Sequence, residues 1–160
     1  MKYFDAHTHV QFVAYNDDRR ETILRAKEAG VGMNVVGTQI DTSRAAVALA
    51  QRYEGVWATI GLHPIHTSKS YHDARELGEG NKEFTSRGEV FDMAAYEALG
   101  RDPKVIAVGE CGLDYFRLEE NTKDVQRDAF IQQIELANKL QKPLMLHIRP
   151  ALQSLGVGGN

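Results

Sequence analysis

The sequence predicts an α/β protein built around a parallel sheet, and three observations support this. Five short stretches rich in branched apolar residues recur along the chain, and helical patterns separate them. Strands that alternate with helices form parallel sheets with helical crossovers. The strand stretches are apolar throughout rather than alternating, which is typical of sheets covered on both faces. With 160 residues, 42% of them hydrophobic, the chain can bury one core in one domain.

The first half of the chain should hold three strands and two helices. We expect the strands at 3–10, 31–38 and 55–62. The helix expected at 17–29 opens with acidic residues, which suit the positive end of a helix dipole, and Gly30 suits its C-terminal stop. The second helix should span about 42–53, with Asp41 as its N-cap.

The second half continues the alternation with two strands and a long helix. The strands fall at 103–110 and 143–148, and a short helix at about 92–101 precedes the first of them. A long helix should begin at Asn121 or Thr122 and end near Gln141, because apolar residues recur there at helical spacing. These residues are Phe130, Ile134, Ala137 and Leu140.

Residues 66–91 interrupt this pattern. They contain three glycines and many charged residues without a sustained period. We predict an insertion loop, with one helical turn at about 71–77, because long irregular segments in compact domains are commonly binding loops or disordered. After Gln153 the chain shows no helix or strand pattern.

Charge and cysteine content narrow the class of protein. The net charge of −3 gives no basic excess, so wide electrostatic wrapping of nucleic acid is not expected. Cys111 is the single cysteine, which excludes an intramolecular disulfide and suits a reducing compartment. The sequence shows neither a signal-peptide pattern nor the roughly 20 apolar residues of a membrane span. We therefore expect a cytoplasmic protein without membrane contact.

Histidines and one glutamate fall where the predicted strands end. His7 and His9 occupy alternate positions of the first strand, so both should point to the same side. His63, Glu110 and His147 follow the third, fourth and fifth strands in "GLHP", "GECGLDY" and "LHIR". The carboxyl ends of parallel strands share one edge, where α/β sheets and barrels build active sites.

This set of side chains predicts a metal site. Imidazoles of His7, His9 and His147 with the Glu110 carboxylate suit Zn, Mn, Fe or Co. A carboxylate can also bridge two cations, which would activate a water and hold a phosphoryl or carbonyl oxygen. Cys111 should point away from Glu110 and serve packing.

Several polar residues keep two interpretations each. His63 either holds the loop beside Pro64 or touches substrate. Asp114 either orients a ligand histidine or caps a turn. Arg149 either receives a phosphate or forms a surface ion pair. We expect His66 and His72, in the insertion, to be solvated.

Five segments resemble one known family. In chain order they are "FDAHTHV", "IGLHP", "VGECGLDYFR", "QRDAFIQQIELA" and "PLMLHIR". Together, over about residues 1–150, they resemble the TatD family of metal-dependent deoxyribonucleases, among the amidohydrolase-like barrels. The resemblance implies a TIM-type (β/α) barrel of which only about the first five strands are present. Residues 1–160 would then form a single TatD-like domain, incomplete at its C-terminus, with the 66–91 insertion on the active-site face.

The resemblance also implies an activity and roles for residues. Family members hydrolyse phosphodiester bonds of DNA, in some cases single-stranded, and use two divalent cations, which here could be Zn, Mn, Mg, Co or Fe. His7 and His9 would bind one cation, Glu110 would bridge, and His147 would bind the second. Substrate contacts would come from His63 and Arg149, with Asp114 supporting a ligand.

The resemblance also leaves alternative functions open. The family's aspartate base and a further histidine come from later strands, so the resemblance assigns no catalytic base in this chain. The chain could instead hydrolyse amides or lactones, as related barrels do, or be an inactive metal-binding fragment; "GECGLDY" matches the nuclease branch better. A partial barrel leaves a strand edge unpaired, so we expect self-association or a complementing chain.

Overall fold

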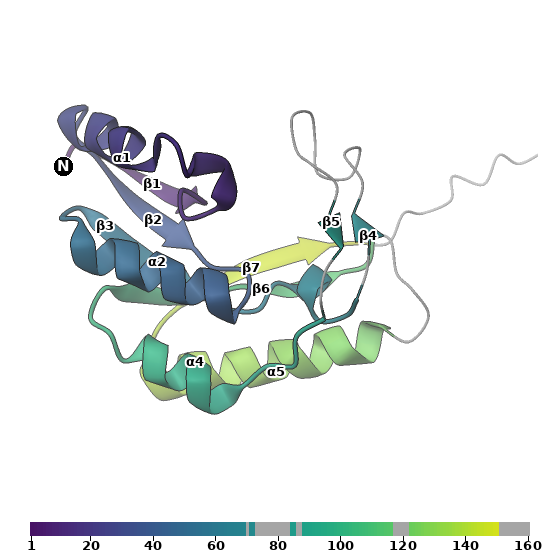
Figure 1. Ribbon diagram of the computed structural model, residues 1–160. Helices are drawn as coiled ribbons and strands as arrows, with labels where there is room; N and C mark the ends of the chain where they lie inside the picture. The colour runs from purple at the N-terminus through teal and green to yellow at the C-terminus, as the bar shows by residue number, and fades with distance from the viewer. Residues whose placement is uncertain (70, 73–83, 86–87, 117–121, 151–160) are drawn as a thin grey trace, which may run out of the picture.

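The computed structural model describes residues 1–69, 71–72, 84–85, 88–116 and 122–150 (Figure 1). Its centre is a five-stranded sheet in the order β1-β2-β3-β6-β7, and every neighbouring pair is parallel. The strands are β1 Tyr3–Thr8, β2 Val31–Val36, β3 Val56–Ile60, β6 Val105–Asp114 and β7 Leu144–Arg149. Each crossover moves on by one strand, as in a (β/α) barrel. The predicted α/β class with five parallel strands is confirmed.

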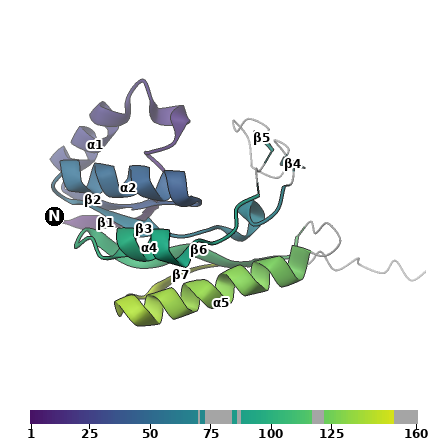
Figure 2. The ribbon, with the colours of Figure 1, turned by 60° about the horizontal axis from the view of Figure 1, so that its bottom comes forward.

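Helices form the crossovers and cover one face of the sheet. They are α1 Arg19–Glu28, α2 Ile40–Arg52, α4 Met93–Gly100 and α5 Thr122–Leu140, with single-turn 3-10 helices η1 Val13–Tyr15 and η2 Pro64–His66. Figure 2 shows α5 running along the sheet, where it packs on β6. No helix within the described ranges is long and apolar enough to cross a membrane.

One apolar core lies between the sheet and these helices. Branched strand residues such as Val35 and Ile60 are fully buried against small residues of α2, including Ala46 and Ala50. Each such branched side chain contributes about 1.5–3 kcal/mol by leaving water. Consecutive residues of the central strand β2, Met33 to Val36, are all buried, so both faces of this strand are covered, although the helices pack on one side of the sheet.

Local details of three predicted elements differ from the structure. The N-cap of α2 is Gln39, whose side chain and that of Thr42 bind each other's backbone N–H, so Asp41 lies inside the helix and is not its cap. The first strand ends at Thr8, two residues early. The fourth predicted strand extends to Asp114, so Glu110 lies within β6.

The insertion is described only in part. Tyr71–His72 (β4) and Phe84–Thr85 (β5) form an antiparallel pair on the side to which the carboxyl ends of the main strands point (Figures 1 and 2). The predicted helical turn is therefore wrong at its first two residues. Its remainder, most of the insertion and residues 151–160 lie outside the described residues.

The buried face of α5 is more polar than predicted. Phe130 and Ile134 are only partly buried, whereas Gln126 and Gln133 are buried in full. The amide of Gln133 accepts from Leu62 N at 2.8 Å and donates to Leu62 O at 3.0 Å. Gln126 does the same with Asp114 N and O, at 2.8 and 3.0 Å. These bonds satisfy backbone groups at two strand ends that would otherwise be buried without partners.

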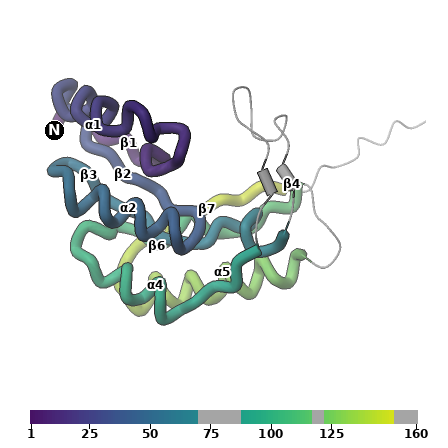
Figure 3. Tube along the Cα trace, viewed as in Figure 1, coloured from purple at the N-terminus to yellow at the C-terminus, as the bar shows by residue number. Residues whose placement is uncertain are grey.

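In the described part of the chain, the sheet has an open edge at each of its two outer strands. The Cα trace in Figure 3 shows β1 and β7 at opposite edges. Tyr3 on β1 is 70% exposed, and Leu146 and Ile148 on β7 are 55% and 60% exposed. Among the described residues no further strand pairs with β1 or β7 on its outer side, and both strands carry exposed apolar side chains.

We expect Gln133→Leu to lower the free energy of unfolding by about 3 kcal/mol, because Leu62 N and O would lose their partners in the core. Urea unfolding followed by circular dichroism measures this. The matched control is Gln132→Leu, which changes the adjacent half-buried glutamine and should shift stability by less than about 0.5 kcal/mol. Equal effects of the two substitutions would contradict the structural role.

Candidate metal centre

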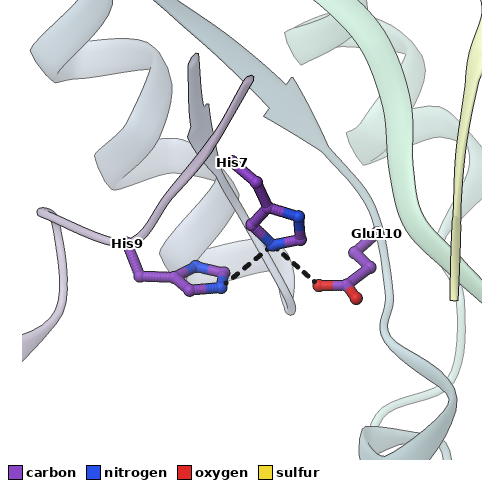
Figure 4. A group of neighbouring side chains, drawn as sticks. All are labelled: His7, His9 and Glu110. Atoms are coloured by element: carbon purple, nitrogen blue, oxygen red, sulfur yellow. Dashed lines mark hydrogen bonds and ion pairs between the residues drawn. The ribbon is translucent and has the colours of Figure 1, made fainter. Parts of the chain in front are cut away.

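The first group of the site is formed by His7, His9 and Glu110 (Figure 4). The Nε2 atoms of the two histidines lie 3.2 Å apart, and His7 Nε2 lies 3.2 Å from Glu110 Oε2. His7 belongs to β1 and His9 follows its end, while β6 supplies Glu110. The backbone N–H of His7 also donates to Asp5 Oδ1 at 3.2 Å. Three atoms able to bind a cation therefore converge from the two strands.

The ring of His9 is held in one orientation. Its Nδ1 lies 2.9 Å from Val36 O, and a carbonyl oxygen can only accept, so Nδ1 carries the proton. The lone pair is then on Nε2, which faces His7. The Phe12 ring stacks on the imidazole at 4.6 Å between centroids. Burial lowers the pKa of His9, so the ring is neutral at neutral pH.

A second group, His63, Glu110 and His147, shares the same carboxylate. His147 Nδ1 lies 3.1 Å from Glu110 Oε1, and His63 Nε2 lies 3.7 Å from that oxygen. The two imidazole centroids are 4.2 Å apart. Glu110 thus faces one group with Oε2 and the other with Oε1.

The electrostatics of Glu110 follow from these neighbours. Burial alone would raise its pKa, but the hydrogen bond from His147 and the nearby imidazoles lower the pKa to about 2. The preceding Gly109 has φ +148°, a conformation that favours glycine, and a Cβ there would overlap the Met145 carbonyl. The low pKa means that the Glu110 carboxylate is ionised at neutral pH. The close approach of Met145 O leaves no room for a side chain at position 109.

His63 is held differently from the other histidines. Its Nδ1 accepts a hydrogen bond from Ile65 N at 3.2 Å, so the proton of the neutral ring must be on Nε2. Burial lowers the pKa of His63 to about 3, which keeps the ring neutral. In this tautomer His63 offers a hydrogen-bond donor, rather than a lone pair, toward Glu110. Its backbone N–H donates to Thr38 O at 2.9 Å.

Asp114 connects His147 to Arg149. It accepts from His147 Nε2 at 2.9 Å, from Arg149 Nε at 3.0 Å and Nη2 at 2.9 Å, and from Phe116 N at 3.1 Å. Although burial opposes it, these donors hold the pKa of Asp114 well below its usual range. Hydrogen bonds to Asp114 and Glu110 raise the pKa of His147 to about 9. Asp114 thus contacts the His147 ring and also accepts from the turn at Phe116. Arg149 forms an ion pair with Asp114 and stacks over the Phe116 ring at 4.5 Å.

The donor set suits divalent metal ions. Within each group the three candidate ligand atoms lie within 4.8 Å of one another, and the groups share one carboxylate. Neutral imidazole nitrogens and carboxylate oxygens are the ligands that Zn, Mn, Fe and Co accept. His7, His9 and Glu110 could hold one cation, and Glu110 a second with His147, once the His147 imidazolium has lost its Nδ1 proton.

His66 and Cys111 are both buried near the site. His66 is only 8% exposed, so the expectation that it is solvated is wrong; its ring centroid lies 6.1 Å from that of His63. The residue in the sequence that could have indicated this burial is Pro64, because it begins the 3-10 helix that contains His66. The side chain of His72 lies outside the described residues. Cys111 is buried, as its predicted packing role requires, and burial raises its pKa to about 12.

Comparison with known proteins places this fold and site in one group. The model of a family described as TatD related DNase matches residues 4–156. The chain belongs to the TatD-related DNase family. It is 36% identical over 149 residues to the "3'-5' ssDNA/RNA exonuclease TatD" of Cronobacter sakazakii, covering 92% of this chain and 49% of that protein. The predicted family is thereby confirmed.

Two further relatives extend the comparison. The "uncharacterized metal-dependent hydrolase YabD" of Bacillus subtilis is 33% identical over 153 residues, covering 95% of this chain and 52% of that protein. The crystal structure of YjjV, a TatD homologue from Escherichia coli, superposes with a TM-score of 0.66 at 26% identity and covers 92% of this chain and 51% of that chain. The chain thus spans about half the length of these relatives, and the predicted partial barrel is confirmed.

Without metal, we expect stability to fall as the pH rises from 6.5 to about 9. His147 has a folded-state pKa above its ordinary value, so its contribution is complete below pH 6.5 and is lost as the pH rises through about 9. The loss should reach at most about 3 kcal/mol. His9 and His63 have pKa values lowered from 6.5, so their titration changes the stability below pH 6.5 and not between pH 6.5 and 9.

Urea unfolding of the EDTA-treated chain at a series of pH values measures this dependence. His147→Gln should flatten it between pH 6.5 and 9. A wild-type profile that is level or rising in this window would show that the two carboxylates do not stabilise the His147 imidazolium.

Proposed function

We propose that this chain carries the metal-binding part of a divalent-metal-dependent hydrolase that cleaves phosphodiester bonds of nucleic acid. The observation that supports it is the shared carboxylate of Glu110 between two groups of imidazoles at the carboxyl edge of a parallel sheet. Such a pair of adjacent sites suits two cations. The names of the TatD and YabD relatives, an exonuclease and a metal-dependent hydrolase, point the same way.

Each residue has a proposed role in holding cations. His7 and His9 would hold one cation and His147, after losing its Nδ1 proton, would hold the second, with the Glu110 carboxylate shared by both. Asp114 fixes the His147 ring through its 2.9 Å contact with Nε2. The cations, when bound, would supply an activated water and stabilise negative charge on the phosphoryl oxygens. Zn, Mn, Mg, Co and Fe remain candidates.

Two further residues are proposed to contact the substrate. His63 presents Nε2–H toward the centre and, being neutral, can donate to a phosphoryl oxygen without repelling the cations. Arg149 places a positive charge beside His147, where it would attract the phosphate. A catalytic base is not assigned to a described residue.

The proposed substrate is single-stranded DNA or RNA. The relative from Cronobacter sakazakii is named for action on ssDNA and RNA. With a net charge of −3, this chain should recognise nucleic acid through local contacts at the site rather than through a broad basic surface.

We also propose that the open sheet is completed by another polypeptide, either a second copy or a complementing chain. The exposed apolar side chains of Leu146 and Ile148 on the edge strand β7 support this. Sedimentation of the 160-residue chain distinguishes a second copy from a monomer. The cytoplasmic location stays a prediction, compatible with the buried thiol of Cys111.

The experiment for the main proposal is metal content and cleavage of single-stranded DNA with Glu110→Gln. This change keeps the shape of the side chain but removes the charge shared by both groups, so we expect loss of at least one bound metal and a drop in cleavage of about 100-fold or more. Glu135→Gln, an exposed change on α5, is the matched control and should behave as wild type.

Parallel assays on amide and lactone substrates decide between bond types. Turnover of those substrates without cleavage of DNA would overturn the nuclease proposal. Metal binding without turnover of either class would favour the metal-binding fragment.

A further inference from the structure

The loop between β1 and α1 is held from one side by a single guanidinium. Arg19, the first residue of α1, donates from Nε to Val10 O at 2.7 Å. Its Nη2 donates to Gln11 O at 3.1 Å and to Phe12 O at 2.9 Å. The same nitrogen lies 2.8 Å from Asn16 Oδ1. Three consecutive carbonyls, all beyond the end of the strand, thus share one donor group.

Arginine suits this task better than other residues. β1 ends at Thr8, so these carbonyls are no longer paired along the sheet edge. A guanidinium presents five N–H donors in a rigid plane, whereas a lysine ammonium is a compact charge on a flexible stem. Arg19 is half-buried, while its neighbour Arg20 is exposed and forms only a 3.5 Å contact with Glu21 in the described part of the chain.

The residues that Arg19 holds are those that surround His9. Phe12 stacks on the imidazole with only 11° between the ring planes, and its N–H donates to His9 O at 3.0 Å. The Gln11 side chain donates to Val36 O at 2.6 Å, the same oxygen that receives His9 Nδ1–H. The position of the His9 ring therefore depends on where this loop lies.

We propose that Arg19 is a positioning residue for His9: by fixing the loop from Val10 to Phe12, it keeps His9 Nε2 directed at His7 and Glu110. Arg19 itself touches neither His7 nor Glu110 in the contacts described. The consequence for metal binding rests on the proposed function, whereas the consequence for ring orientation does not. The two can therefore be measured separately.

The first measurement is nuclear magnetic resonance of the histidine rings in the metal-free chain. In wild type, His9 should appear as one tautomer protonated at Nδ1. Arg19→Ala should replace this signal by that of a ring exchanging between tautomers, while His63 and His147 keep theirs. Arg20→Ala, the matched control, should leave all three unchanged.

The second measurement is titration with Co²⁺, followed by its visible absorption. Arg19→Ala should weaken binding at the histidine pair by about 10-fold, as expected when support of a metal ligand is removed. Added guanidinium ion should restore part of the affinity, and Arg19→Lys should recover less than wild type. A purely structural loss would instead weaken every imidazole signal and would not respond to guanidinium.

The outcomes separate the two proposals. An unchanged His9 signal in Arg19→Ala, or equal loss of the His9, His63 and His147 signals, would overturn the positioning role. A wild-type chain with an ordered His9 ring that binds no Co²⁺ would overturn the proposed function, while the ring signals would still decide the role of Arg19.

Discussion

One carboxylate, that of Glu110, determines how the rest of the centre is arranged. Three imidazoles from three different strand ends approach its two oxygens, at 3.2 Å for His7, 3.7 Å for His63 and 3.1 Å for His147. This negative charge faces Nε2–H of the neutral His63 ring and, together with Asp114, stabilises the His147 imidazolium. The parallel sheet serves this arrangement because it brings the carboxyl ends of β1, β3, β6 and β7 to one edge.

Besides the contacts among its functional side chains, the centre is supported by bonds from other side chains to backbone atoms. Gln133 holds both backbone groups of Leu62, next to His63, and Gln126 holds those of Asp114. Arg19 applies the same principle to the loop beside His9. Buried polar groups of this kind are stabilising only when all of them are satisfied, which ties the order of the site to the order of the core.

Much of the fold and of the candidate site could be predicted from the sequence because both depend on local patterns. Apolar runs marked the strands, and the residues following them, such as His63 and Glu110, could be assigned to one edge by the rule for parallel sheets. The burial of Gln126 and Gln133 could not be predicted, because a polar residue on a helix is ordinarily interpreted as facing solvent. The backbone partner of Gln133 also lies 71 positions away in the sequence. Gln39 was missed although its capping box with Thr42 is local, because glutamine is not among the preferred N-cap residues. His66 was missed because it was assigned to the solvated insertion, whereas it belongs to the 3-10 helix that begins at Pro64.

The glutamine bonds have a further consequence for how such a scaffold can change. An amide that binds only N–H and C=O is indifferent to the side chain of the residue it holds. Leu62 and Asp114 are thus anchored through atoms that every amino acid except proline possesses. Substitutions at neighbouring strand ends could then exchange one ligand type for another while the strand keeps its place, so new chemistry could be sampled on this framework without rebuilding the helix behind it.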